Sequence, residues 1–324
     1  MVATPSLSGA MSGRPRPLNL NRDIPQVMAL LDLVFRPTLQ ADEQQARRGN
    51  LTLHSQPGFV LRLSQLATGI APGFVWEEAG KIIGNVSLLS SKQAGRYLIA
   101  NVAVHPDFRR RGIARSLLET ALTHLRQRQG RQVLLQVENI NFSAKHLYED
   151  LGFVALGDVI TWYLPSSRYR ELPVHDARDI RQLDGSAWRA AYALDQAFMP
   201  PDLYWPDPVG PELYQQNLWR RLGNFLNGQQ VEAWAALDDE GKLVGTALIR
   251  SEFGQPHELF LRVAPAGQGQ WERPLLAKLM RRLRYLRRRH IKMVHPAADE
   301  WTQALLMEAG FQNRRTLTTM KLQL

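Results

Sequence analysis

The sequence predicts a mixed α/β fold, with helices on both faces of a mixed sheet, that is built twice in tandem. Apolar strands alternate with amphipathic helices along the chain, and this alternation is typical of α/β layers. The same landmarks return after a nearly constant number of residues. With 324 residues and 44% hydrophobic content, the chain is long and apolar enough to fill two cores.

Three landmarks of the first half recur in the second half. A hairpin turn with its strand recurs at an offset of 161 residues, a strand end before proline at 159, and a Gly-Phe pair at 158. The pairs are Gly80–Gly84 with Gly241–Gly245, Val104–Pro106 with Val263–Pro265, and Leu151–Phe153 with Ala309–Phe311. We therefore expect a flexible tail over residues 1–16, a first domain over 17–164, a linker over 165–169 and a second domain over 170–324.

Each expected domain opens with a helix after a short strand-like run. Apolar periodicity predicts these helices over Ile24–Phe35 and Ala177–Phe198. The segment Met199–Pro208 follows the second helix and is rich in proline and aromatic residues. It predicts a rigid surface loop, with the wall of a substrate site as the alternative.

The most informative stretch joins a β-branched strand, a basic loop and an amphipathic helix. The strand breaks at Pro106, and the loop that follows contains Arg109, Arg110, Arg111, Gly112, Ile113 and Ala114. One face of the next helix is apolar, through Ile113, Leu117, Leu118, Ala121, Leu122 and Leu125. Small residues, arginines and the unpaired amides of a helix's first turn suit two linked phosphates, so we expect a pyrophosphate cradle. A solvated turn is the simpler interpretation of the loop taken alone.

The cradle and a later motif together resemble the Gcn5-related N-acetyltransferase (GNAT) family. Arg109, Gly112 and Ala114 match the family's acetyl-CoA loop, and Val133–Asn141 with the Tyr148-to-Phe153 ending is similar to its later strand, Asn-led helix and Tyr-x-x-x-Gly-Phe sequence. The resemblance is firm over residues 75–164 and covers the second half only as architecture. It implies a duplicated acyl-CoA N-acyltransferase fold of the tandem type, similar in architecture to mycothiol synthase.

The resemblance implies transfer of an acetyl group from acetyl-CoA, as co-substrate, to a primary amine by direct attack in a ternary complex. Val102, Ala103 and Val104 would pair with the pantetheine arm, and one of their amides would stabilise the oxyanion. Asn141 would cap the next helix or reach the pantetheine. Tyr148 would donate a proton to the departing thiolate.

The general base is the least defined of these groups. The position matching the family's glutamate holds Gln136, which cannot take a proton, while Glu138 lies on the same side of the strand. Glu138 is therefore the candidate, with a water chain as the alternative base and a salt bridge as the alternative role of this glutamate. Tyr148 and Asn141 also have simpler interpretations, as a core aromatic and a helix cap.

The second half keeps the scaffold and loses these groups. Trp271 stands in the place of Gly112, where an indole would fill the space that a pyrophosphate needs. Leu306 replaces Tyr148, and Asp299 replaces the helix-opening asparagine. We therefore expect a degenerate second domain that is structural or shapes the acceptor pocket.

Composition excludes several other classes of site. The chain has no cysteine, so it forms no disulfide, thiol nucleophile or cysteine metal site, and its eight histidines form no metal motif. The first sixteen residues lack the apolar core of a signal peptide, and no apolar run is long enough to span a membrane. We expect a cytoplasmic protein without a metal.

The net charge of +10 favours a rival hypothesis, binding of nucleic acid, because six arginines lie within residues 281–289 beside Tyr285 and His290. A buried leucine face on that helix would leave the arginines to solvent, so nucleic acid is the less favoured partner. A third hypothesis is an acetyl-CoA sensor without turnover. The sequence does not identify the amine acceptor, which is a small molecule or a protein, or the oligomeric state. We expect residues 36–64 and the proline-rich loop to form the pocket for the acceptor.

Overall fold

A computed structural model describes residues 13–173, except 48–72, and residues 179–324, except 216–227. The chain divides into two compact units that are interleaved in sequence. Unit 1 comprises Met1–Gln136, Ser143–Val154 and Lys321–Leu324, and unit 2 comprises Val137–Phe142 and Ala155–Met320. The predicted ranges 17–164 and 170–324 describe the repeat in the sequence and stay a prediction.

Unit 1 contains a mixed sheet in the order β1-β2-β3-β4-β5. Only β4 and β5 are parallel among these neighbours, and the other pairs are antiparallel. The elements are β1 (Pro15–Pro17), α1 (Ile24–Arg47), β2 (Gly73–Glu78), β3 (Lys81–Ser90), β4 (Arg96–Val104), α3 (Ile113–Gln127), β5 (Gln132–Glu138) and α4 (Phe142–Asp150).

Unit 2 repeats this arrangement in the order β7-β8-β9-β10-β11, with β6 next to β11. Strands β10 and β11 are its parallel pair, at the place that β4 and β5 hold in unit 1. The elements are β6 (Val154–Leu164), β7 (Ile180–Gln182), α5 (Trp188–Phe198), β8 (Gln229–Leu237), β9 (Leu243–Glu252), β10 (His257–Val263), α7 (Glu272–Leu283), β11 (Ile291–Pro296), α8 (Glu300–Glu308) and β12 (Gln312–Gln323). The mixed α/β prediction is confirmed.

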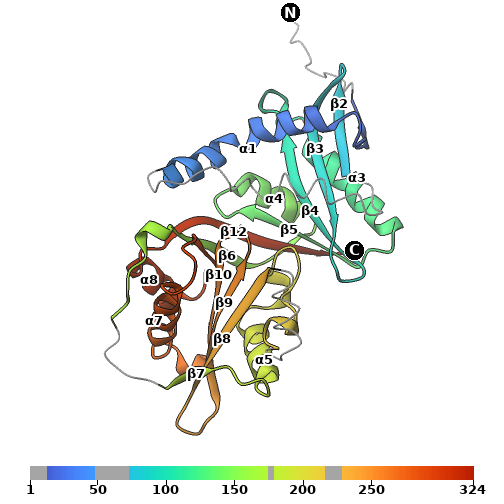
Figure 1. Cartoon of the computed structure of the whole chain (residues 1–324). Coiled ribbons are helices and arrows are strands. Elements are labelled where there is room, and N and C mark those ends of the chain that lie inside the picture. The colour runs from blue at the N-terminus through green and yellow to red at the C-terminus, as the bar shows by residue number, and fades with distance from the viewer. Residues whose placement is uncertain (1–12, 48–72, 174–178, 216–227) are drawn as a thin grey trace, which may run out of the picture. The chain divides into compact units, whose positions relative to one another are not determined.

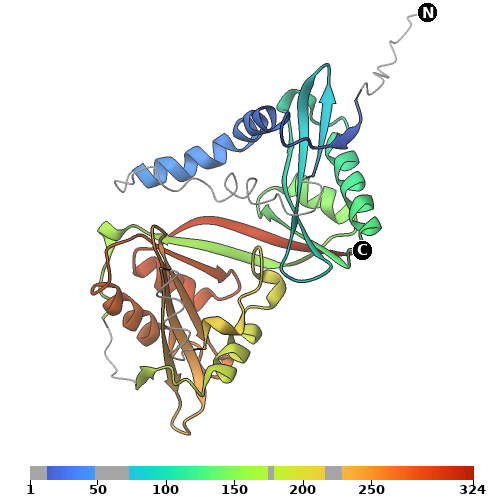
Figure 2. The same cartoon turned by 45° about the vertical axis from the view of Figure 1, so that its right-hand side comes forward.

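Helices cover both faces of the sheet within each unit. Figures 1 and 2 show α1 and α3 on opposite faces in unit 1, and Figure 1 shows α5 opposite α7 in unit 2. The apolar face predicted for α3 is buried at each of its six positions. On the other face, α1 packs through Val27, Leu30 and Leu31 against Val75 and Ile82.

The glycine that recurs in the hairpin strand is explained in both units by a helix that packs closely against it. A Cβ on Gly84 would lie 2.9 Å from side-chain atoms of Ile113 and Leu117 in α3. A Cβ on Gly245 would lie 2.7 Å from Leu275 in α7. The repeated glycine therefore lets the long helix of each unit lie close to the sheet.

The two opening helices differ from their predicted bounds. The first begins at Ile24 as predicted and continues to Arg47. The second begins only at Trp188, so the prediction from Ala177 onward was wrong; residues 177 and 178 lie outside the described part. Residues 180–182 instead form the edge strand β7, and a turn in which Asp184 accepts from the Ser186 amide at 2.7 Å separates this strand from the helix.

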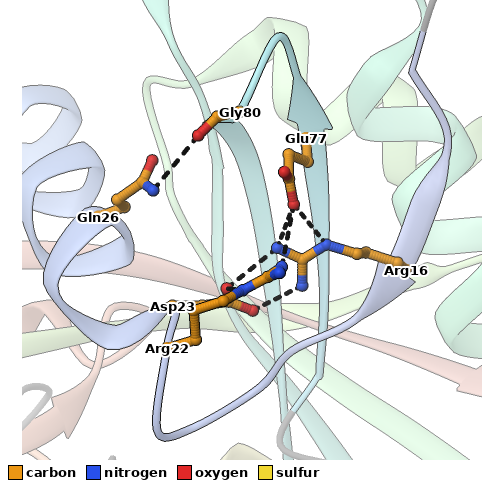
Figure 3. A pocket seen from close by; sticks show the side chains of 6 residues that line it. All are labelled: Arg16, Arg22, Asp23, Gln26, Glu77 and Gly80. Atoms are coloured by element: carbon orange, nitrogen blue, oxygen red, sulfur yellow. Dashed lines mark hydrogen bonds and ion pairs between the residues drawn. The ribbon is translucent and has the colours of Figure 1, made fainter.

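A charged cluster fastens β1 and the start of α1 to the β2–β3 hairpin (Figure 3). Arg16 Nη1 lies 2.6 Å from Asp23 Oδ2, and Arg16 Nε lies 2.7 Å from Glu77 Oε2. Arg22 also contacts both carboxylates, at 3.0 and 3.1 Å. The small hollow of about 150 Å³ that these groups line has two positive and two negative side chains, so it carries no excess charge for a ligand. The cluster is a tether between elements.

Candidate active site

Strand β4 contains a bulge that interrupts its pairing with β3. Asn101 has a φ of 57°, and the register shifts between Asn85 and Ser87 on the neighbouring strand. Asn85 is fully buried and its Nδ2 donates to the Asn101 carbonyl at 2.8 Å and to Ser87 Oγ at 3.3 Å. Asparagine tolerates the left-handed region better than its apolar neighbours in this strand, so the bulge forms at this residue.

Beyond the bulge, no strand of the described residues pairs with β4 on the side away from β3, and we call this side its free edge. Its parallel pairing with β5 ends at Ile99 and Leu135, although β4 continues to Val104. The His105 amide donates to the Ile83 carbonyl of β3 at 2.8 Å. Because successive amides of a strand point in opposite directions, those of Val102 and Val104 point away from β3. These two amides are therefore available to a ligand lying along the edge.

Ala103 is placed differently from its two neighbours. Its side chain is 2% exposed and packs in the core beside α1, and it is paired with Asn85 of β3. Of the three strand residues predicted to contact a cofactor, the free edge thus includes Val102 and Val104.

The basic loop leads from β4 into α3 through two left-handed residues. A short 3-10 turn, Pro106–Phe108, follows the strand, and then Arg110 and Gly112 have φ values of 64° and 74°. A Cβ on Gly112 would meet no atom within 4 Å, so the space above this residue is open. The amides of residues 110–115 donate to no acceptor within the described ranges, and the first helical bond is from the Ser116 amide to the Gly112 carbonyl. This row of free donors at a helix N-terminus suits an anion.

The three arginines of the loop have different surroundings. Arg111 donates to both carboxylate oxygens of Glu78 in the β2–β3 hairpin, at 3.0 and 3.2 Å, and lies over the Phe108 ring. Arg109 Nε donates to the Val104 carbonyl at 3.3 Å, at the end of the free edge. Arg110 is exposed and forms no ion pair with a described residue. Arg111 therefore fixes the loop, while Arg110 keeps its charge free for an anion.

Tyr148 lies on α4 and is 6% exposed. Its ring packs edge-on against Phe153, with centroids 6.0 Å apart. Burial raises the pKa of its phenol, which keeps the hydroxyl protonated well above neutral pH. An ion pair from Arg115 to Asp150, at 2.6 Å, joins α4 to the first turn of α3. The helix that carries the phenol is thus held next to the helix that follows the basic loop.

Glu138 and Asn141 lie in the short segment Val137–Phe142, which clusters with unit 2. The Glu138 carboxylate lies 4.0 Å from Arg315 Nε, and its carbonyl accepts the Asn141 amide at 2.9 Å. Asn141 immediately precedes α4, as predicted, and is exposed. The arginine neighbour fits the structural interpretation of Glu138 as one member of an ion pair.

In unit 2, the loop before α7 corresponds to the basic loop before α3. Side chains of unit 2 itself occupy the space that is open at Gly112 in unit 1. Trp271 is 8% exposed within the core, and the amides of Gln270 and Trp271 donate to the Gly267 carbonyl. Glu272 is buried in the first turn of α7, where burial raises its pKa while the amides of Gly269 and Trp271 act in the opposite direction. A protein carboxylate and an indole therefore occupy the neighbourhood of this helix N-terminus.

Strand β10 and helix α8 of unit 2 also lack features that β4 and α4 have in unit 1. Pairing of β10 with β9 is regular from Glu258 to Val263, without a bulge. Leu306, in the place of Tyr148, is fully buried. Asp299 caps α8 by accepting the Thr302 amide at 3.1 Å.

Two supporting residues of the site, Asn85 and Glu78, were not identified from the sequence. Asn85 is a lone amide in an apolar strand, and this is the signal that was available: a buried polar side chain needs a partner. Glu78 gives no such signal, because an acidic residue before a hairpin turn is ordinary. The side chains of residues 36–64, expected to shape the acceptor pocket, lie outside those described.

No helix of the described ranges is long and apolar enough to cross a bilayer. Within the same ranges, no three His, Asp or Glu side chains are grouped as metal ligands would be.

Comparison with known proteins agrees with this geometry. Residues 41–153 match the acetyltransferase (GNAT) family. Over 53 residues the chain is 47% identical to the ribosomal protein bS18-alanine N-acetyltransferase of Salmonella typhimurium, a match that covers 16% of this chain and 36% of that protein. The chain therefore spans about a third of that relative's length.

Two solved structures are similar over nearly the whole chain. A GCN5-related N-acetyltransferase from Sphaerobacter thermophilus has a TM-score of 0.59 and 18% identity, covering 96% of this chain and 95% of that one. A tandem GNAT protein from the clavulanic acid biosynthesis pathway has a TM-score of 0.50 and 15% identity, covering 96% and 98%. At such identities these matches show the fold, including its duplication.

Proposed function

We propose that unit 1 transfers an acetyl group from acetyl-CoA to a primary amine, because residues 41–153 match the acetyltransferase (GNAT) family. The observation that carries the proposal is the row of free amides over residues 110–115, with open space at Gly112, directly after a strand with a free edge. This combination provides donors for a pyrophosphate and, beside them, donors for an extended amide-bearing chain.

In this proposal the cradle and strand position acetyl-CoA. The amides of residues 110–115 and the free charge of Arg110 bind the pyrophosphate, while Arg111 holds the loop through Glu78. The amides of Val102 and Val104 pair with the pantetheine arm, and one of them donates to the oxygen of the thioester carbonyl as negative charge develops there. Binding at two points orients the thioester for attack.

The reaction joins the acceptor nitrogen to the thioester carbon and releases the sulfur. The amine attacks the carbonyl carbon, a C–N bond forms and the C–S bond breaks. Tyr148 donates its phenolic proton to the departing thiolate; burial raises the pKa of this phenol, so the proton is present at neutral pH although the phenol is a weaker acid. The proton lost by the amine goes to Glu138 or to a water chain; the Arg315 neighbour of Glu138 favours water.

Unit 2 has a structural or substrate-shaping role in this proposal. Three features support it: the buried Trp271 and Glu272 at the α7 N-terminus, the regular β10, and Leu306 in the place of the phenol. Each removes one part of the arrangement that unit 1 retains. We expect one acetyl-CoA site per chain.

The acceptor is a primary amine of a small molecule or a protein. The bS18-alanine relative is named for an amine on a protein, which makes a peptide amino terminus one candidate class. An acetyl-CoA sensor without turnover remains the second candidate, since a buried Tyr148 packed on Phe153 also fits a purely structural aromatic.

Two experiments distinguish the acetyltransferase from the sensor: calorimetric titration with acetyl-CoA, and a screen of amines for release of free CoA. The proposal expects one site per chain, lost in Gly112→Val, and turnover with at least one amine class. Binding without turnover for any amine supports the sensor. Two sites per chain, or a site that survives Gly112→Val, contradicts the proposal.

A further inference from the structure

The segment that runs from α7 through the following loop to the end of β11 carries an excess of positive charge. Residues 273–298 contain nine Lys and Arg and no Asp or Glu. The helix buries Leu275, Leu276, Leu279 and Leu283, as predicted, so the charged side chains point outward. This part of unit 2 has no role in the proposed acetyl transfer.

Some of these arginines are neutralised and others are not. Arg273 pairs with Glu308, Arg282 with Glu232 at 2.6 Å, Arg284 with Glu171 and Lys292 with Glu258, while Arg289 keeps its charge and donates to the Glu252 backbone carbonyl. Arg281, Arg287 and Arg288 are exposed and form no ion pair with any residue in the described ranges. A structural role explains the first group and leaves the second unexplained.

A second segment adds charge to the same place. The Tyr169 hydroxyl donates to the Arg289 carbonyl, and Glu171 pairs with Arg284. These contacts fix the exposed Arg168 and Arg170 beside the loop. We call Arg168, Arg170, Arg281, Arg287 and Arg288, together with Tyr285, the basic surface.

Tyr285 indicates which polyanion fits. Its side chain is 77% exposed, and it lies in the sequence between Arg284 and Arg287. An exposed aromatic ring among guanidinium groups suits a ligand that combines a base, which stacks on the ring, with phosphates, which contact the arginines. Bases are accessible for stacking in a single strand.

We propose that the basic surface of unit 2 binds single-stranded nucleic acid, with phosphates on the unpaired arginines and a base on Tyr285. The proposal is independent of acetyl transfer, because none of these residues belongs to the site in unit 1. It revises the expectation that nucleic acid is the less favoured partner, since three arginines of the block form no ion pair with a described residue.

The test is fluorescence anisotropy with a labelled single-stranded RNA over a range of salt concentrations. The variant Arg281→Ala/Arg287→Ala/Arg288→Ala is expected to lose affinity at least about tenfold and to lower the salt slope by about 2, because each single-strand phosphate contact contributes about 0.7. Tyr285→Ala should weaken binding roughly five- to hundredfold without changing the slope, and Tyr285→Phe should restore it. The matched control is Lys81→Ala/Arg126→Ala/Arg128→Ala, which removes three exposed charges from unit 1.

Thermal unfolding and acetyl-CoA titration of each variant report whether it is folded. Three results would overturn the proposal: no RNA binding near physiological salt, an equal loss in the control variant, or tighter binding of polyglutamate or anionic vesicles through the same arginines. Binding of duplex DNA that ignores Tyr285 would contradict the assignment to single strands.

Discussion

Arg115 in the first turn of α3 lies 2.6 Å from Asp150 at the end of α4, measured from Nη2 to Oδ2. The same relationship recurs 158 residues later, where Arg273 Nη1 lies 2.9 Å from Glu308 Oε1. All four side chains are more than a third exposed, so each pair contributes at most about 1 kcal/mol to stability. The pair in unit 1 is therefore of interest because it positions α4, and not because it stabilises the fold.

Asp150→Asn tests that positioning. Loss of the ion pair frees the end of α4, which carries Tyr148, so we expect kcat to fall by less than about tenfold while the free energy of unfolding changes by no more than about 1 kcal/mol. Glu308→Gln removes the equivalent pair of unit 2 and should leave kcat unchanged. Equal losses of kcat in both variants would show that α4 has no special connection with the reaction.

Tyr148→Phe tests the proton donor. Without the hydroxyl, the thiolate leaves unprotonated, and kcat should fall by about a hundredfold to ten-thousandfold with little change in the KM for acetyl-CoA. Because burial raises the pKa of this phenol, the rate of the native protein should show no loss attributable to Tyr148 as pH rises to about 10. Tyr97→Phe, which removes another phenol of unit 1, is the control. A fully active Tyr148→Phe variant would leave this residue as a core aromatic.

Gly112→Ala separates backbone strain from loss of the cradle. Gly112 and Gly80 have φ values of 74° and 76°, and a Cβ would meet no atom within 4 Å at either position. Alanine should cost each about 1 kcal/mol of stability. Only Gly112→Ala should also weaken acetyl-CoA binding, because its methyl group enters the space above the free amides. Titration calorimetry of the two variants distinguishes them, and equal affinities would remove the cradle assignment.

The repeating helices and strands could be predicted from the sequence more fully than the contacts that form the candidate site. The long helix from Ile113 and its buried face follow from apolar periodicity, because burial on one side of a helix requires it. Gly84 and Gly245 follow from close helix packing. Trp271 is buried at the counterpart loop, and the loss of a cofactor site in unit 2 stays a prediction.

The start of the second opening helix and the surroundings of the loop arginines depend on tertiary contacts, which could not be predicted from the sequence. The helix expected from Ala177 was shortened because an edge strand competes for residues 180–182 with local helical preference. The role of Arg111 in fixing the loop depends on Glu78, thirty-three residues away in the sequence. Neither relationship leaves a local pattern.

Asn85→Leu tests whether the β4 bulge depends on the amide beneath it. The Asn101 carbonyl would lose its partner in a partly buried site, at a cost of about 1 kcal/mol, and β4 would tend toward regular pairing. We expect the KM for acetyl-CoA to rise about tenfold, since the bulge sets the direction of the Val102 amide. Thr246→Val is the control: Thr246 is the counterpart of Asn85 by the 161-residue offset, is fully buried, and lies beside the regular β10. Unchanged binding in Asn85→Leu would show that the bulge is set by β4 alone.

The charged cluster of Figure 3 predicts a specific acid sensitivity of unit 1. Arg16, with the Asn19 amide and Arg22, holds the pKa of the Asp23 carboxyl well below its ordinary value of 3.8, against the effect of burial. The unfolded chain therefore takes up this proton first, so the stabilisation is present above about pH 4 and is lost as pH falls below it. Asp23→Asn should lower the free energy of unfolding by about 2 kcal/mol at pH 7 and flatten its decline between pH 5 and pH 3. Asp239→Asn, at an exposed turn, should change neither quantity. Denaturant titrations across this pH range measure both, and a parallel decline in the native protein and Asp23→Asn would show that other carboxyls govern acid unfolding.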